Sequence, residues 1–227
     1  MPDLDAGKRS ANSKGMEFKL TYAGPLFSTG NKAGGLTKTN HKHEIRLAFD
    51  PQLQRLWQIT ESLRYAKSTG PRPIAVAGGK AGPLIIRSPA LTAEQLAEKH
   101  VRNDWRFVPL VTRELDLWCG LDILFLRSGK SGSLLKRGDL DGRLKTLLDA
   151  LAMPDQNQGY EKREQSPQPL YTLLEDDRLI SKVSVETDEL LEPPPGDLGF
   201  SDLNYVRLVI SVRIRPYEAN FGNIQFI

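Results

Sequence analysis

Two aspartates and a lysine lie close together in the middle of the chain, within residues 139–151. Asp139 and Asp141 are one residue apart, where a predicted strand gives way to a predicted helix. From Asp141, Lys145 and Asp149 follow after four and eight residues, so the three side chains stack along one helix face. Carboxylates gathered in this way repel one another unless a hard cation neutralises them. Because Mg²⁺ prefers oxygen ligands and keeps water for phosphate chemistry, the stretch predicts a magnesium site.

An acidic pair, Asp176-Asp177, follows later in the chain and extends this pattern. With it, the sequence resembles the RusA-type Holliday-junction resolvases. In that family an apolar strand runs into a basic loop, then into an Asp-x-Asp helix with a lysine, then into an Asp-Asp pair followed by a strand. Here the strand is 121–126 and the basic loop is 127–137, and the resemblance covers residues 117–186.

The resemblance implies a fold, a reaction and roles for these residues. The fold would be α+β, a mixed β-sheet with helices packed on it. The reaction would be cleavage of four-way or otherwise branched DNA by a homodimer that uses Mg²⁺, with Mn²⁺ as an alternative ion. The implied metal ligands are Asp139, Asp141 and Asp177. Lys145 would be the catalytic lysine, and Asp149 and Asp176 would support the site.

Two features depart from the family pattern. Gly142 stands where the family usually has Asn, so a side-chain hydrogen bond in the first helical turn is lost. A polar insertion at about 154–170 is much longer than the short connection typical of the family, and a second one is predicted at about 187–204. In a rival interpretation the chain is a catalytically decayed RusA-like protein that binds nucleic acid or acts as a scaffold, and Gly142 and the long insertion mark the decayed site. A nuclease for flaps or single strands is a third reading.

Positive charge is concentrated near the motif. Residues 127–145 hold six Lys or Arg against two Asp, and residues 1–49 hold eight against four, although the whole chain carries only +3. Such cations suit a polyanion that must approach an acidic centre, and the alternative is that they are solvated loop charges. The residues predicted to contact DNA are Lys130, Lys136, Arg137 and Arg143.

Composition excludes several classes of protein. Apolar residues make up 39% of the 227 residues and charged residues 26%, which is typical of a globular chain. No apolar run approaches the roughly 18 residues of a membrane span, and the N-terminus lacks the apolar segment of a secretory signal. The lone Cys119 permits no internal disulfide, so a reducing, cytoplasmic setting without a membrane partner is expected.

The pattern of apolar residues predicts one RusA-like domain over 16–227, preceded by a disordered tail at 1–15. Alternation of period two predicts strands, and spacing of three and four predicts helices. The predicted strands are 16–22, 107–112, 117–126, 182–186 and 205–215, the third lying next to the second and the last closing the sheet. The predicted helices begin at Asp50, with Pro51 in its first turn, at Thr92, with a Gln95 capping box, and at Asp139.

Single residues also have plain structural explanations. Asp139 and Asp177 are types that cap helices and turns, and Lys145 could pair with Asp141 or Asp149 on the helix surface. Residues 129–131, Gly-Lys-Ser, lack the upstream glycine of a phosphate-binding loop, since Leu124 stands there. Residues 41–43, His-Lys-His, are interpreted as a solvated strand entry rather than as phosphate contacts, and Cys119 as a core residue.

Overall fold

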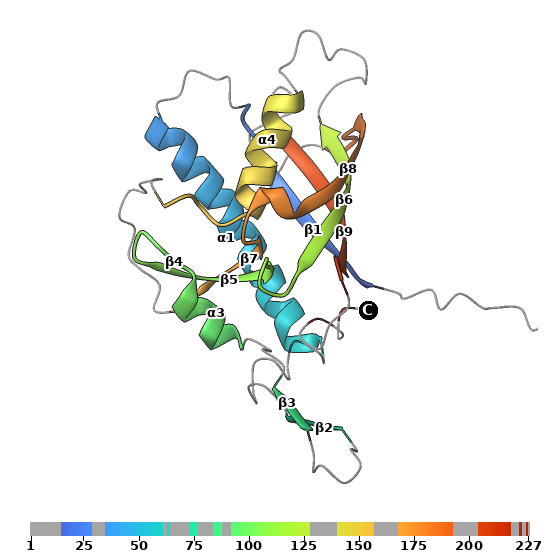
Figure 1. Cartoon of the computed structure of the whole chain (residues 1–227). Coiled ribbons are helices and arrows are strands. Elements are labelled where there is room, and N and C mark those ends of the chain that lie inside the picture. The colour runs from blue at the N-terminus through green and yellow to red at the C-terminus, as the bar shows by residue number, and fades with distance from the viewer. Residues whose placement is uncertain are drawn as a thin grey trace, which may run out of the picture.

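The computed structural model describes residues 15–28, 35–60, 63, 73–76, 84–87, 92–127, 140–156, 168–192, 204–218, 223 and 226. Within these ranges the chain has an α+β fold with two mixed β-sheets and a separate antiparallel pair, β2 (Pro73–Val76) with β3 (Leu84–Arg87) (Figure 1). The predicted α+β class is therefore confirmed. The predicted tail, except Gly15, and most of both predicted insertions lie outside the described residues.

The larger sheet has four strands in the order β1 (Met16–Pro25), β9 (Tyr205–Pro216), β6 (Leu117–Arg127) and β8 (Ile180–Glu189). β1 and β6 are each antiparallel to β9, whereas β6 and β8 are parallel. Alternate residues of β6 and β9 are buried, as the two-residue period predicts for a sheet covered on one face. The predicted strands are confirmed here, but the last strand lies inside the sheet rather than at its edge.

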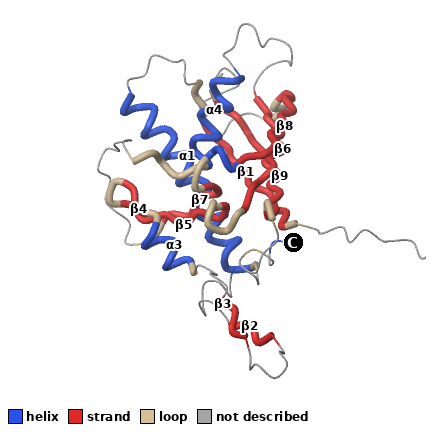
Figure 2. The backbone as a smooth tube through the Cα atoms, in the orientation of Figure 1, coloured by secondary structure: helices blue, strands red, loops and turns tan. Residues whose placement is uncertain are grey.

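Two helices, α1 (Gly35–Ile59) and α4 (Leu140–Leu151), lie side by side over this sheet (Figure 1, Figure 2). Phe49 and Trp57 of α1 and Leu147 and Leu151 of α4 belong to the same buried cluster as the inner face of the sheet. Apolar burial of this kind stabilises a fold by roughly 25 cal/mol per Å² removed from water. The prediction of a helix over about 139–152 is confirmed.

The start of α1 corrects the prediction of a helix beginning at Asp50. The helix begins fifteen residues earlier and runs through Pro51. Pro51 lacks the N–H that would bond to the Leu47 carbonyl, and both residues are exposed, so water can reach that carbonyl. Asp50 does not cap: its carboxylate accepts from the Tyr171 N–H at 2.7 Å and from Gln54 at 2.9 Å. Tertiary contacts override the local start signal.

The smaller sheet has the order β4 (Val101–Arg102), β5 (Trp105–Val111) and β7 (Leu170–Leu174). β5 and β7 are parallel, and helix α3 (Ala93–Lys99) packs beside β5. The predicted capping box is confirmed, since Thr92 accepts from the Gln95 N–H while Gln95 accepts from the Thr92 N–H. β5 and β6 are consecutive but belong to different sheets, so the prediction that they are neighbours in a sheet is wrong.

Cys119 lies on the inner face of β6 and is 1% exposed. Burial raises the pKa of its thiol to about 12, so the side chain behaves as part of the core, as predicted. Among the described residues, no helix combines the length and the apolarity that a membrane crossing requires.

Candidate functional site

The parallel pairing of β5 with β7 decides where the acidic pair lies. Parallel strands end at the same edge of a sheet, so Arg113, which follows β5, meets Glu175 and Asp176, which follow β7. The Glu175 N–H donates to the Val111 carbonyl at 2.9 Å, and the Arg113 N–H donates to the Glu175 carboxylate at 2.9 Å. Two segments about sixty residues apart in sequence thereby form one polar edge.

The end of α4 is fastened to the same edge. The Met153 N–H donates to the Leu174 carbonyl at 3.0 Å, and Ala152 forms an isolated parallel bridge with Leu174. The last turn of α4, which carries Asp149, therefore lies beside the acidic pair. Between them is a cavity of about 390 Å³. Its charged lining residues are four arginines, Arg46, Arg102, Arg113 and Arg178, and five acids, Asp149, Asp155, Glu175, Asp176 and Asp177.

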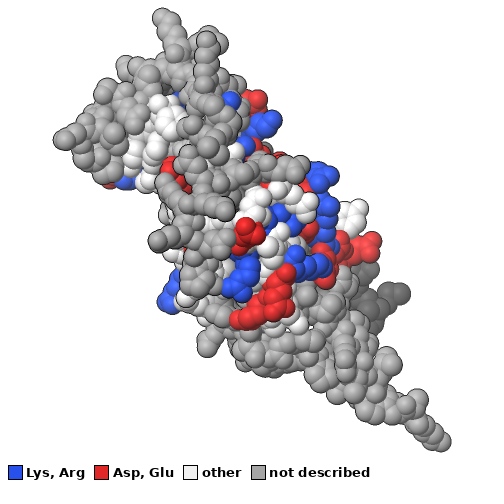
Figure 3. Space-filling view, turned by 90° about the vertical axis from the view of Figure 1, so that its left-hand side faces the viewer, with Lys and Arg blue, Asp and Glu red and all other residues white. Residues whose placement is uncertain are grey.

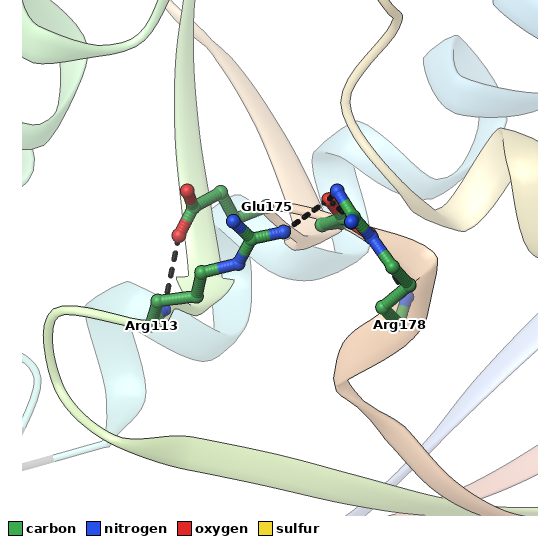
Figure 4. Close-up of polar contacts among 4 residues, drawn as sticks. Arg113, Glu175 and Arg178 are labelled. Carbon is green, nitrogen blue, oxygen red and sulfur yellow. Dashed lines mark hydrogen bonds and ion pairs between the residues drawn. The ribbon is translucent and has the colours of Figure 1, made fainter.

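Asp176 forms ion pairs with two arginines. Its carboxylate lies 2.5 Å from Nη2 of Arg113 and 2.6 Å from Nη2 of Arg178, and it also accepts from the Arg178 N–H at 3.0 Å (Figure 4). These hydrogen bonds, above all those from the Arg178 side chain, hold the pKa of Asp176 far below its usual range. Asp176 is also the N-cap of the short helix η2 (Asp177–Leu179), so it is the pair's capping residue.

Asp177 has a different environment. Its side chain is exposed at the edge of the cavity, yet the protein around it desolvates the carboxylate and raises its pKa, with repulsion from Asp176 and Asp149 adding to the effect. Among the described residues, no lysine or arginine forms an ion pair with Asp177 within 4.0 Å. This carboxylate is therefore the member of the acidic pair that a cation would stabilise most.

Asp149 is held by helix α1. Lys42 pairs with its carboxylate at 2.6 Å, and Arg46 donates to the Asp149 carbonyl and to the Ala152 carbonyl, both at 2.8 Å. The prediction of a strand entry at 41–43 is wrong, since these residues lie in α1, and it led away from Lys42; Arg46 belongs to no sequence motif. His41 and His43 are in fact buried within α1. The spacing of Lys42 and Arg46, one helical turn, is the signal that was available.

Asp141 and Lys145 lie on the exposed face of α4, as their spacing predicts. Neither lines the cavity. Asp141 precedes Asp149 by eight residues, or about 12 Å along the helix axis, so the cavity adjoins the end of α4 opposite to Asp141. The structure brings Asp177 together with Asp149 and Asp176, and the shared cleft of Asp177 with Asp139 and Asp141 stays a prediction.

Arg143 is wrongly placed for the predicted DNA contact. Its side chain is on the buried face of α4, 3% exposed, and donates to Asn204 at 3.3 Å. The other residues predicted to contact DNA, Lys130, Lys136 and Arg137, lie outside the described residues, as does Asp139. Within the described ranges, no group of three or more His, Cys, Asp or Glu residues is arranged to hold a metal ion. The described carboxylates alone do not complete a magnesium site.

The face of the molecule turned to the viewer in Figure 3 carries interleaved acidic and basic side chains rather than a patch of one sign.

No protein-family model, curated protein or solved structure matches the chain. The resemblance to RusA-type resolvases stays a prediction from the motif residues.

Proposed function

We propose that this protein is a metal-dependent endonuclease that hydrolyses phosphodiester bonds in branched DNA, such as Holliday junctions, with a RusA-like fold. The observation that carries the proposal is the place of Asp177, which the motif assigns to the metal: it lies at the edge of the cavity, and among the described residues no Lys or Arg pairs with it within 4.0 Å. The raised pKa of Asp177 supports it, because carboxylates that repel one another favour a bound cation. Cytoplasmic action fits the buried, unpaired Cys119.

Each residue has a role in this proposal. Asp177 would hold Mg²⁺ or Mn²⁺ together with Asp139 and Asp141, the other two ligands that the motif assigns, and the ion would neutralise charge that develops on the phosphate. The exposed Lys145, one turn after Asp141, would contact the phosphate undergoing cleavage. Lys42 keeps Asp149 neutralised and outside the ligand set. Lys130, Lys136 and Arg137 would bind the DNA backbone.

A second candidate function is supported by a specific observation. The described carboxylates Asp149 and Asp176 are already paired with cations, and no described metal-binding group is complete. This favours a protein that binds branched DNA without cutting it. A panel of four-way, flap, duplex and single-stranded DNA, incubated with Mg²⁺, separates the two functions. The nuclease proposal expects cleavage that EDTA abolishes, whereas binding without cleavage of any substrate supports the rival.

We expect the protein to form a two-fold dimer, because paired cuts on opposite arms of a junction require two active sites on one particle. Light scattering at micromolar concentration, with and without a four-way junction, measures the mass directly. A chain that stays monomeric under both conditions contradicts junction resolution but leaves cleavage of simpler branched substrates intact.

A further inference from the structure

Two arginines from different segments converge on Asp176. Arg113 follows β5 and Arg178 lies in η2, and their guanidinium groups point toward one another across the shared carboxylate (Figure 4). Arg113 donates through Nη2, and Arg178 donates through both Nε, at 2.9 Å, and Nη2. The Glu175 carboxylate accepts from the Arg113 N–H and so fixes the start of that turn.

The two guanidinium groups of this cluster share the Asp176 carboxylate. The arginine side chains are 53% and 76% exposed, whereas that of Asp176 is 20% exposed. Each guanidinium has five N–H donors, and those not used by Asp176 donate to no other described residue. The cluster therefore presents oriented N–H donors to solvent.

We infer that Arg113 and Arg178, oriented by Asp176, form a binding site for a phosphodiester group of the DNA backbone at the edge of the acidic cavity. This inference rests on the proposed function for the identity of the ligand. Planar guanidinium groups match the oxygens of a phosphate with paired hydrogen bonds. Because Asp176 already restrains both side chains, binding costs less conformational entropy than it would for free surface arginines. Asp176 is thus a positioning residue rather than a metal ligand.

The position of the site explains why acids and arginines share one cavity. The Asp177 carboxylate repels phosphate. A DNA strand that approaches a metal ion at Asp177 therefore needs positive side chains close by to offset this repulsion. Arg113 and Arg178 supply it within the same cavity lining. They would hold a phosphate beside the one that is cleaved, which fixes the position of the strand without reading its bases.

The test measures binding of the full chain to a fluorescent four-way junction by anisotropy, without divalent ions, over a series of NaCl concentrations. Arg113→Gln and Arg178→Gln should each weaken binding about tenfold, or about 1.4 kcal/mol, since each loses charge-assisted hydrogen bonds to the phosphate. The Arg113→Gln, Arg178→Gln double variant should reduce the salt slope by about 0.9, the value for one phosphate contact on duplex DNA. The Arg113→Lys, Arg178→Lys double variant should keep the slope but lose affinity, because lysine lacks the planar fork.

Arg55→Gln is the matched control, because Arg55 is exposed on α1 and does not line the cavity. It should bind like the parent, and urea unfolding should show that every variant is folded. If the double Gln variant binds with the parent's affinity and slope while the parent cleaves DNA, the phosphate site is overturned and the nuclease stands. If the parent cleaves nothing but the Gln variants lose binding, the site stands and the nuclease falls. A parent that binds no DNA at low salt overturns both.

Discussion

Asp177→Asn is expected to reduce Mg²⁺-dependent cleavage of branched DNA by at least about 10²-fold, a typical cost of removing one electrostatic contribution to a transition state. Asparagine keeps the size of the side chain and removes the negative charge that the proposal assigns to the metal. Asp141→Asn should have a similar effect, although Asp141 lies on the exposed face of α4 and outside the cavity. Initial rates on a four-way junction at saturating Mg²⁺ measure both.

A measurement of stability distinguishes loss of a metal ligand from unfolding of the Asp177→Asn variant. The pKa of Asp177 is raised in the folded chain, so ionisation of Asp177 costs folding free energy as the pH rises through that pKa. Asn removes this cost, and the urea midpoint at neutral pH should stay the same or rise. The parent's affinity for Mg²⁺ should fall as the pH drops through the raised pKa, since protons compete with the metal for the carboxylate.

Asp188→Asn is the matched control for Asp177→Asn, because Asp188 is exposed eight residues beyond the start of β8, about 26 Å along the strand. Its cleavage rate should equal that of the parent. If both Asp177→Asn and Asp141→Asn cleave at the parent's rate with Mg²⁺, the proposed metal site is wrong. The acidic residues would then have only structural roles, such as the capping by Asp176.

Local sequence signals correctly predicted the helices and strands whose tertiary contacts agree with those signals. The alternation in β1 and β9 and the capping box at Thr92 led to correct elements because burial on one face and a satisfied helix start are local properties. Asp50 and Pro51 also have the residue types of a helix start. The helix start predicted from them is wrong, because Asp50 bonds to Tyr171, a contact 121 residues away that no local pattern contains.

The candidate site also consists of residues that local sequence predicts and residues that only tertiary pairing adds. The Asp176-Asp177 pair and the acidic face of α4 were visible as composition and spacing. Arg113 was not, because it reaches Asp176 only through the parallel pairing of β5 with β7, and parallel pairing leaves no turn signal between the strands. Arg143 was misassigned because a positive charge beside a motif suggests DNA contact, whereas the phase of the helix turns this residue inward.

Arg46→Met is expected to destabilise the fold by about 3 kcal/mol, because it leaves one buried and one partly buried carbonyl group without their donor, and an unsatisfied buried group costs roughly 1–3 kcal/mol. Arg46 is 2% exposed, and its guanidinium satisfies the Asp149 and Ala152 carbonyls at the end of α4, where helical carbonyls lack partners within the helix. Methionine replaces the apolar part of the side chain and supplies no donor. Urea unfolding should show a midpoint lowered by more than about 1 M.

Two further variants assign the cause of that loss. Arg55→Met changes an exposed arginine on the same helix and should shift stability by less than about 0.5 kcal/mol. Lys42→Met removes the cation that pairs with the Asp149 carboxylate but keeps both Arg46 hydrogen bonds, so it should cost less than Arg46→Met. Equal losses of stability for Arg46→Met and Lys42→Met would mean that α1 stabilises the end of α4 through the charge of Asp149 rather than through the two carbonyls. A loss below about 0.5 kcal/mol for Arg46→Met would mean that the end of α4 does not depend on α1, and the fixed position of Asp149 beside Asp177 would need another cause.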